Sequence, residues 1–246
     1  MELYLDTAQL AEVAEATSWG VLRGITTNPS HVFKAGVRDL KPHIQEMCHT
    51  ADVPISVEVV TLDADEMVAQ GSAFAAWSPH VVVKVPTIPA GLRAMSRLAR
   101  TDVMATCDGC RYRSDCPIRA RFEAAGGLTR TLQVNATLIF SANQAILALA
   151  AGAAYVSPFV GRLDAVGEDG VQLVRDIAAI LAHQRQRGKI IAAALRHPIH
   201  VIEVAKAGAD IATMSFSLLA QLVEHPLTER GLADFMADYE RSKVQP

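Results

Sequence analysis

The 246-residue sequence lacks the features that mark several common classes of protein. It has no uninterrupted apolar run long enough to span a bilayer, and its first residues, MELYLD, lack the basic and apolar regions of a secretory signal. The net charge of -3 gives no overall attraction to nucleic acid or to a membrane surface. Neither G-x-G-x-x-G nor G-x-x-x-x-G-K-[ST] occurs, which argues against a nucleotide-binding, doubly wound sheet. We therefore expect a cytoplasmic protein that binds neither nucleic acid nor membrane.

Aromatic residues are also scarce, at 5% of the chain, whereas 50% of its residues are hydrophobic. The core must therefore rest on Ala, Val, Leu and Ile. Short runs of these residues alternate with helical patterns, as expected for strands and helices around a parallel sheet. Eight such runs occur, at residues 3–6, 24–27, 55–60, 81–86, 133–138, 154–159, 189–194 and 210–215. They predict an α/β protein with one domain over 1–246, a (β/α)8 (TIM) barrel with extra C-terminal helices.

Side chains along a barrel strand point alternately into the barrel and outward toward the helices. In VVVKVP the three odd-numbered valines share one side, so we expect Lys84 to point inward. The same alternation predicts that Leu138 points outward. Five further polar side chains are expected in the interior or at its C-terminal rim: Asp6, Asn28, Glu58, Asn135 and Thr137.

Burying so many polar groups is costly unless they bond one another or a ligand. Lys84 paired with Asp6 and Glu58 would form a structural network if nothing were bound. Polar groups at the C-terminal ends of several barrel strands are, however, where such barrels hold their catalytic residues. A desolvated lysine amine attacks carbonyl groups and forms a Schiff base, for which neighbouring carboxylates serve as bases. The set of residues therefore favours Schiff-base chemistry.

Seven segments match, in order, the motifs of one enzyme family: LYLDTA, GITTNPS, SVEVV, VVVKVP, NATLIFSANQA, GAAYVSPFVGRLD and AAALRHP. The chain thereby resembles the transaldolase family in its short, fructose-6-phosphate aldolase-like form. The resemblance implies transfer of a dihydroxyacetone unit from sedoheptulose 7-phosphate to glyceraldehyde 3-phosphate, which yields erythrose 4-phosphate and fructose 6-phosphate. It also implies phosphorylated sugars as substrates, no cofactor for catalysis and a homo-oligomer.

The resemblance further implies a role for individual residues. The family's Schiff-base lysine corresponds to Lys84, and the aspartate that assists C–C cleavage corresponds to Asp6. The glutamate and threonine that position the catalytic water correspond to Glu58 and Thr137. The residues implied to bind the substrate's hydroxyls and phosphate are Asn28, Asn135, Ser157, Arg162 and Arg196. The two arginines also follow the sixth and seventh strands at one rim, where a guanidinium suits a phosphate.

Three positions bear on the reaction. Glu58 and Phe159 match transaldolases, whereas fructose-6-phosphate aldolases usually carry Gln and Tyr there, so transfer is favoured over simple aldol cleavage. Ala194 stands where a serine usually precedes the second arginine by two residues, which predicts one fewer hydrogen bond to phosphate. A non-catalytic sugar-phosphate-binding barrel is the alternative. A metal-dependent hydrolase is disfavoured, because none of the eight histidines lies in an expected strand.

Residues 101–132 form an insertion where barrels usually need two to six residues. It contains three of the chain's four cysteines: Cys107, Cys110 and Cys116. A C-x-x-C spacing brings two thiolates to one ion, and Cys48 is the candidate for a fourth ligand, with His49 or His43 as alternatives. The insertion predicts either a structural Zn or iron–sulfur site or a loop with free thiols or a redox pair. Because it precedes a strand, we expect it opposite the active-site mouth.

Overall fold

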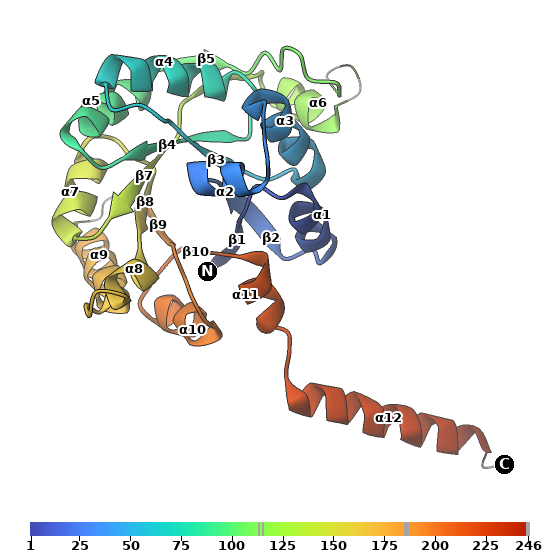
Figure 1. Ribbon diagram of the computed structural model, residues 1–246. Helices are drawn as coiled ribbons and strands as arrows, with labels where there is room; N and C mark the ends of the chain where they lie inside the picture. Colours follow the sequence, from blue (N-terminus) through green and yellow to red (C-terminus); the bar gives the residue numbers. More distant parts are fainter. Residues whose placement is uncertain (113, 115, 185–186, 245–246) are drawn as a thin grey trace.

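The computed structural model describes residues 1–112, 114, 116–184 and 187–244 (Figure 1). Arg113 and Asp115, which belong to the 101–132 insertion, lie outside this part of the chain. Within it, eight parallel strands close into a barrel in which each strand pairs with two neighbours. Around the barrel they are β1 (Glu2–Asp6), β2 (Leu22–Thr26), β3 (Ile55–Glu58), β4 (Val81–Pro86), β7 (Val134–Ile139), β8 (Tyr155–Pro158), β9 (Lys189–Ala192) and β10 (Ile211–Met214). The predicted (β/α)8 barrel is confirmed.

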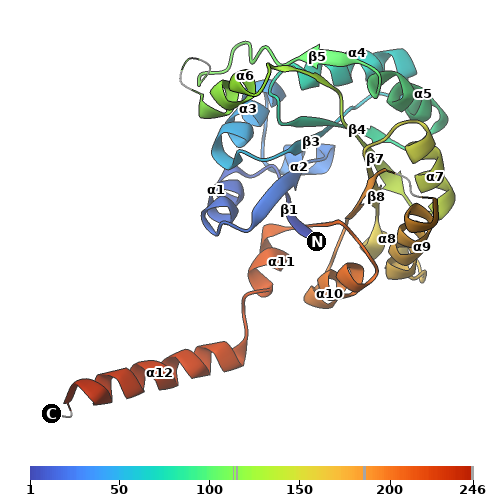
Figure 2. The ribbon, with the colours of Figure 1, turned by 180° about the vertical axis from the view of Figure 1, so that it is seen from behind.

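Helices surround the barrel and connect its strands (Figures 1 and 2). Those that follow the first four strands are α1 (Leu10–Ser18), α2 (Pro29–Lys34), α3 (Leu40–Ala51), α4 (Ala64–Ala75) and α5 (Pro89–Leu98). Those that follow the last four are α7 (Ala142–Ala150), α8 (Val160–Asp164), α9 (Gly170–Gln184), α10 (Pro198–Lys206), α11 (Phe216–Gln221) and α12 (Pro226–Val244). The helix α12 extends away from the barrel (Figure 1).

The strand β4 shows how the sequence fixes the direction of the side chains. All six of its residues are buried, because helices cover its outer side and the barrel interior lies on the other. Val81, Val83 and Val85 belong to the core between the sheet and the helices. Lys84 therefore points inward, as the alternation predicts.

The strand β7 departs from this alternation near its C-terminal end. Its register with β8 shifts between Ala136 and Ile139, and Leu138 has a positive φ of 57°. As a result Leu138 is 40% exposed and lines the cleft described below, while Ile139 takes the buried place in the outer core. The prediction that Leu138 points outward is wrong, because a β-bulge adds one residue to the strand.

A small hydrophobic cluster fills the barrel interior toward the N-terminal ends of the strands. Tyr4, Ile191 and Ile211 form this cluster. A Cβ on Gly24 would lie 2.2 Å from the Tyr4 ring, so only glycine leaves room for that ring.

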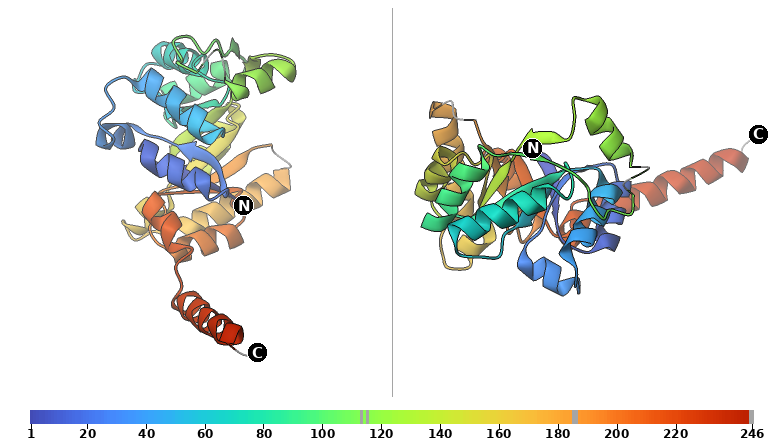
Figure 3. Two further views of the ribbon diagram at one scale, coloured as in Figure 1. Left: turned by 90° about the vertical axis from the view of Figure 1, so that its right-hand side faces the viewer. Right: turned by 90° about the horizontal axis from the view of Figure 1, so that it is seen from above.

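The insertion forms a small substructure that the sequence did not predict. An antiparallel pair, β5 (Asp102–Met104) and β6 (Thr129–Thr131), flanks the helix α6 (Pro117–Ala124). Its attachments lie near the N-terminal end of β4, where Cys107 N donates to Ala76 O at 3.1 Å and Arg130 Nη2 donates to Val81 O at 2.6 Å. Both views in Figure 3 place α6 on the side of the N-terminus, away from α2 and α8. The insertion thus lies opposite the C-terminal ends of the strands, as predicted.

No helix in the described part of the chain has both the length and the apolar character needed to cross a membrane.

Candidate active site

A cleft of about 510 Å³ opens at the C-terminal ends of the strands. Seven of the nine residues predicted for the active site line it: Asp6, Asn28, Glu58, Lys84, Ser157, Arg162 and Arg196. The other two, Asn135 and Thr137, are fully buried. The structure therefore brings side chains from most of the strands into one volume.

Lys84 lies at the buried end of the cleft and is only 4% exposed. Its Nζ donates to Thr27 O at 3.0 Å and lies 3.1 Å from Glu58 Oε2. The pairing of strands explains this placement, because Lys84 lies beside Glu58 on one neighbouring strand and beside Asn135 on the other. The amine thus has a carboxylate within reach to take its proton, on the wall of an open cleft.

Asp6 is held by two partners at the end of β1. Its Oδ1 accepts from Thr26 Oγ1 at 2.8 Å, and its Oδ2 lies 3.2 Å from His31 Nε2. Burial alone would raise the pKa of Asp6, but the hydrogen bond and charge of His31, the charge of Lys84 and the Thr26 hydroxyl together hold that pKa below its usual value. Asp6 is therefore an ionised carboxylate at neutral pH.

Asn135 links three strands through its side chain. Its Nδ2 donates to Ser56 Oγ at 3.1 Å, and its Oδ1 accepts from Ser157 Oγ at 2.7 Å. Within the described residues the hydroxyl of Thr137 has no hydrogen-bond partner, although it is buried. A buried hydroxyl without a partner is costly, so this one is suited to bind a water molecule or a substrate.

Two arginines form part of the outer wall of the cleft, on α8 and just after β9. Neither Arg162 nor Arg196 has an ion-pair partner among the residues that the structure describes, whereas the nearby Asp164 lies 2.8 Å from His200 Nε2. Close packing sets their spacing, since a Cβ on Gly161 would lie 2.4 Å from Ala194 O and 2.7 Å from Arg196 Cγ. Two guanidinium groups without a carboxylate partner suit an anionic ligand such as a phosphate.

Strand alternation identified neither His31, which lines the cleft, nor His200, which bonds the backbone of the cleft residue Arg196. His31 lies on α2 and contacts Asp6, while His200 on α10 accepts from Arg196 N at 3.2 Å through Nδ1. Both belong to helices that follow the strands, and alternation holds only within a strand. Asn28, three residues before His31, accepts from the backbone N of His31 at 3.0 Å and caps α2. An Asn-Pro pair at a helix start is the one sequence signal for this turn.

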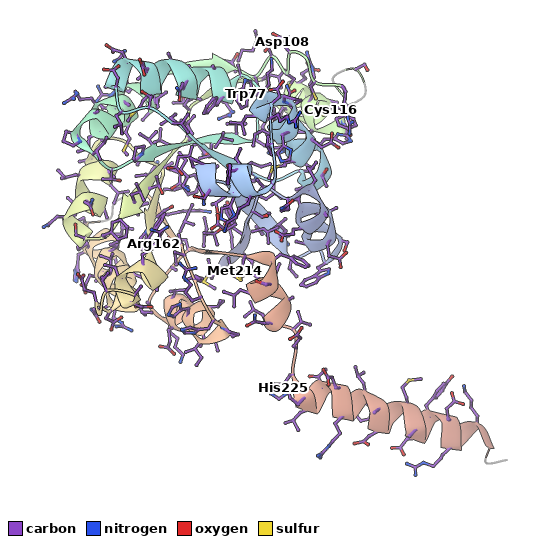
Figure 4. All side chains as sticks on the ribbon, in the orientation of Figure 1. Trp77, Asp108, Cys116, Arg162, Met214 and His225 are labelled. Carbon is purple, nitrogen blue, oxygen red and sulfur yellow. The ribbon has the colours of Figure 1, made fainter. Side chains whose placement is uncertain are left out.

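None of the four cysteines forms a disulfide within the described residues, and all of them line one small pocket next to the insertion. Burial raises the pKa of the Cys48 thiol to about 12, against the lowering effect of a hydrogen bond with Ser78. His49 lines the same pocket, whereas His43 bonds Ala8 O at 2.7 Å through Nε2 and is not among the lining residues. In the described part of the chain, no three His, Cys, Asp or Glu side chains stand in metal-binding geometry. Figure 4 shows Cys116 beside α6, with Trp77 on the same side of the barrel and Arg162 on the opposite side.

Comparisons with known proteins agree with this geometry. Residues 3–245 match the model of the Transaldolase/Fructose-6-phosphate aldolase family. A probable transaldolase of Roseiflexus sp. (strain RS-1) is 46% identical and the match covers 97% of each chain, and one of Moorella thermoacetica is 43% identical over 99% of each. A solved structure, thiamine phosphate pyrophosphorylase from Pyrococcus furiosus, shares the fold with a TM-score of 0.50 at 18% identity over 87% of this chain and 85% of that one. The chain belongs to the transaldolase/fructose-6-phosphate aldolase family.

Proposed function

We propose that this transaldolase transfers a dihydroxyacetone unit between sugar phosphates through a Schiff base on Lys84. The observation that carries the proposal is the buried amine of Lys84 on the wall of the cleft, 3.1 Å from the Glu58 carboxylate. The reaction that fits is the conversion of sedoheptulose 7-phosphate and glyceraldehyde 3-phosphate into erythrose 4-phosphate and fructose 6-phosphate.

The first half-reaction forms and then breaks the donor adduct. Glu58 accepts a proton from Lys84, and the free amine adds to C2 of the ketose; the C2 oxygen leaves as water and an iminium remains. Asp6, ionised as described, removes the proton of the C4 hydroxyl. The C3–C4 bond then breaks, its electron pair moves into the iminium to give an enamine, and the aldehyde departs.

The second half-reaction runs these steps in reverse with another aldehyde. C3 of the enamine adds to C1 of the acceptor, and Asp6 returns its proton to the new hydroxyl. Water then hydrolyses the iminium and releases Lys84. We assign the positioning of this water to Glu58 and Thr137, because the Thr137 hydroxyl is buried without a partner in the described residues.

The remaining residues predicted for the active site hold the sugar phosphate in this proposal. Asn28, Asn135 and Ser157 bind hydroxyl groups near the reacting carbons. Arg162 and Arg196 bind the phosphate, which accounts for two guanidinium groups that lack a carboxylate partner within the described chain. Ala194 also lines the cleft, and its methyl side chain offers no hydroxyl to the phosphate.

Phe159 favours transfer over simple aldol cleavage. Its ring lines the cleft and packs against Phe140 with ring centroids 5.7 Å apart. A phenylalanine offers no proton donor at this wall. The enamine is then consumed by a second aldehyde more readily than by a proton.

Borohydride trapping tests the proposal. Fructose 6-phosphate and borohydride should give a reduced secondary amine on Lys84, which peptide mass analysis identifies. Release of glyceraldehyde 3-phosphate should depend on erythrose 4-phosphate if transfer dominates. Rapid release without an acceptor would indicate an aldolase instead, and the absence of an adduct would contradict the Schiff base.

Replacing His31 with asparagine should move the acid limb of the activity profile to higher pH. The imidazole lowers the pKa of Asp6, so that pKa should rise in H31N and the carboxylate should protonate at a higher pH. The profile of kcat/KM against pH measures this shift, and borohydride trapping at neutral pH should be unchanged. An acid limb that coincides with that of the wild type would show that His31 does not act on Asp6.

We further propose that the chain forms a homo-oligomer through α12. Four exposed apolar side chains follow one stripe of this helix, at the spacing of an amphipathic face: Leu232, Phe235, Met236 and Tyr239. A helix that extends from the barrel with such a stripe needs a partner to cover it, and a second copy of the chain offers the same face. The expected mass from sedimentation is a multiple of 26.4 kDa, and a monomer at micromolar concentration would contradict the proposal.

The compartment that we propose is the cytoplasm. No disulfide links the four cysteines within the described residues, although Cys110 and Cys116 are only half-buried. Thiols of this kind persist in a reducing compartment. Fractionation of the source cells would test the assignment.

A further inference from the structure

The four cysteines come from separate parts of the chain and share one pocket. Cys48 lies in the last turn of α3, Cys107 and Cys110 lie in the loop after β5, and Cys116 is the N-cap of α6. Cys110 follows Cys107 by three positions, whereas Cys48 precedes Cys107 by 59 positions. The fold therefore brings every cysteine of the chain to the lining of a single pocket.

The loop that carries Cys107 and Cys110 is shaped as a tight turn. Cys110 N donates to Cys107 O at 3.2 Å, and Cys107 and Gly109 have positive φ values of 54° and 74°. A positive φ is strained for cysteine, and such strain is typical of functional sites. It indicates that this turn has a function besides local stability. A C-x-x-C turn of this kind is how proteins direct two thiolates toward one ion.

Gln45 links this turn to α3, the helix that carries Cys48. It is buried, and its Nε2 donates to Trp77 O and to Asp108 O, both at 3.2 Å. Asp108 lies between the two cysteines of the turn, and Gln45 precedes Cys48 by three residues, so both lie on one side of α3. The loop and Cys48 are therefore held against each other by groups other than the cysteines.

A cation next to this pocket favours an anionic occupant. Arg130 donates to Ser78 O at 3.4 Å and to Val81 O at 2.6 Å, but has no carboxylate partner in the part of the chain that the structure describes. Its Nε is buried and unpartnered there as well. A divalent ion with four thiolates carries two negative charges, which would offset this guanidinium.

The size of the pocket bears on what it holds. Its free volume is about 20 Å³, close to what one water molecule or one ion occupies. A cluster of several iron and sulfide atoms needs much more space. Four sulfur ligands around a single ion are typical of structural zinc.

We propose that Cys48, Cys107, Cys110 and Cys116 bind one Zn²⁺ ion that ties the insertion to α3. Each thiol releases its proton to solvent as the ion binds, and the side chains turn inward from their positions around the pocket. His49 is not a ligand in this proposal, because the four thiols complete a tetrahedral shell. The site lies opposite the cleft and serves stability, so the proposal is independent of the reaction at Lys84.

Metal analysis of the purified full-length chain is the primary test. Protein produced with zinc in the medium should contain about one Zn per chain, the ratio of a closed structural site. Cys48→Ser and Cys116→Ser should each lose most of it, whereas the matched control His49→Asn should keep it. Zinc in C48S together with its loss in H49N would overturn the assignment of the ligands, and iron with sulfide would overturn the single ion.

Cobalt substitution covers the case in which the cysteine variants fail to fold. Adding Co²⁺ to the zinc-depleted wild type should give the intense thiolate charge-transfer and d–d absorption of a tetrahedral site. Zinc should abolish these bands and protect all four thiols from alkylation. Wild-type protein without bound zinc, without cobalt bands and with four reactive thiols in the presence of zinc would overturn the proposal.

Discussion

Replacing Lys84 with methionine is expected to abolish borohydride trapping and to lower kcat by at least about 10⁴-fold, the order of loss that follows removal of a covalent nucleophile. Methionine is an unbranched side chain one atom shorter than lysine and fits the Val-rich strand, but it cannot form an iminium. The cleft and both arginines should remain, so binding of the sugar phosphate should be retained. Steady-state kinetics and mass analysis of the trapped peptide measure the two effects.

Stability needs a separate control in this experiment. Lys84 and Glu58 form a buried ion pair at 3.1 Å, and removal of one partner of such a pair costs roughly 3–5 kcal/mol. The double variant K84M/E58Q removes the unpaired carboxylate and should recover part of that stability while remaining inactive. Substantial activity in folded K84M would show that the amine is not the nucleophile.

Regular strand geometry explains why much of the site could be predicted. The alternation in β4 placed Lys84 inside the barrel, and the pairing of neighbouring strands brought it beside Glu58 and Asn135. The direction of each of these side chains follows from a period of two residues and an apolar outer face. Such information is local, and a sequence displays it directly.

Irregular backbone explains what could not be predicted. The bulge in β7 reverses the direction of the Leu138 side chain, and no residue type in that segment predicts a bulge. His31 reaches Asp6 from a helix whose position depends on how the chain turns after β2. The insertion is a further case, because the loop between β5 and α6 contacts α3 through residues far apart in the chain, as in the hydrogen bond between Gln45 and Asp108.

Replacing Asp6 with asparagine is expected to separate the two stages of the reaction. Asparagine can still accept the hydrogen bond from Thr26, so the end of β1 should keep its structure. It cannot take a proton from the C4 hydroxyl, and loss of a general base lowers rates by about 10²- to 10⁴-fold. D6N should therefore still form a trapped adduct on Lys84 with fructose 6-phosphate while C–C cleavage becomes slow.

The dependence of stability on pH provides a second measurement on the same variant. The pKa of Asp6 is lower in the folded chain than its usual value, so its carboxylate stabilises the folded state above the unfolded pKa of about 3.9. This contribution is lost as the pH falls through the folded pKa. The difference in unfolding free energy between wild type and D6N should therefore be largest near neutral pH and shrink in acid. If the difference did not depend on pH, the neighbours of Asp6 would not lower its pKa. If C–C cleavage in D6N were also unchanged, Asp6 would not be the base. The proton of the C4 hydroxyl would then have to pass to another group in the cleft.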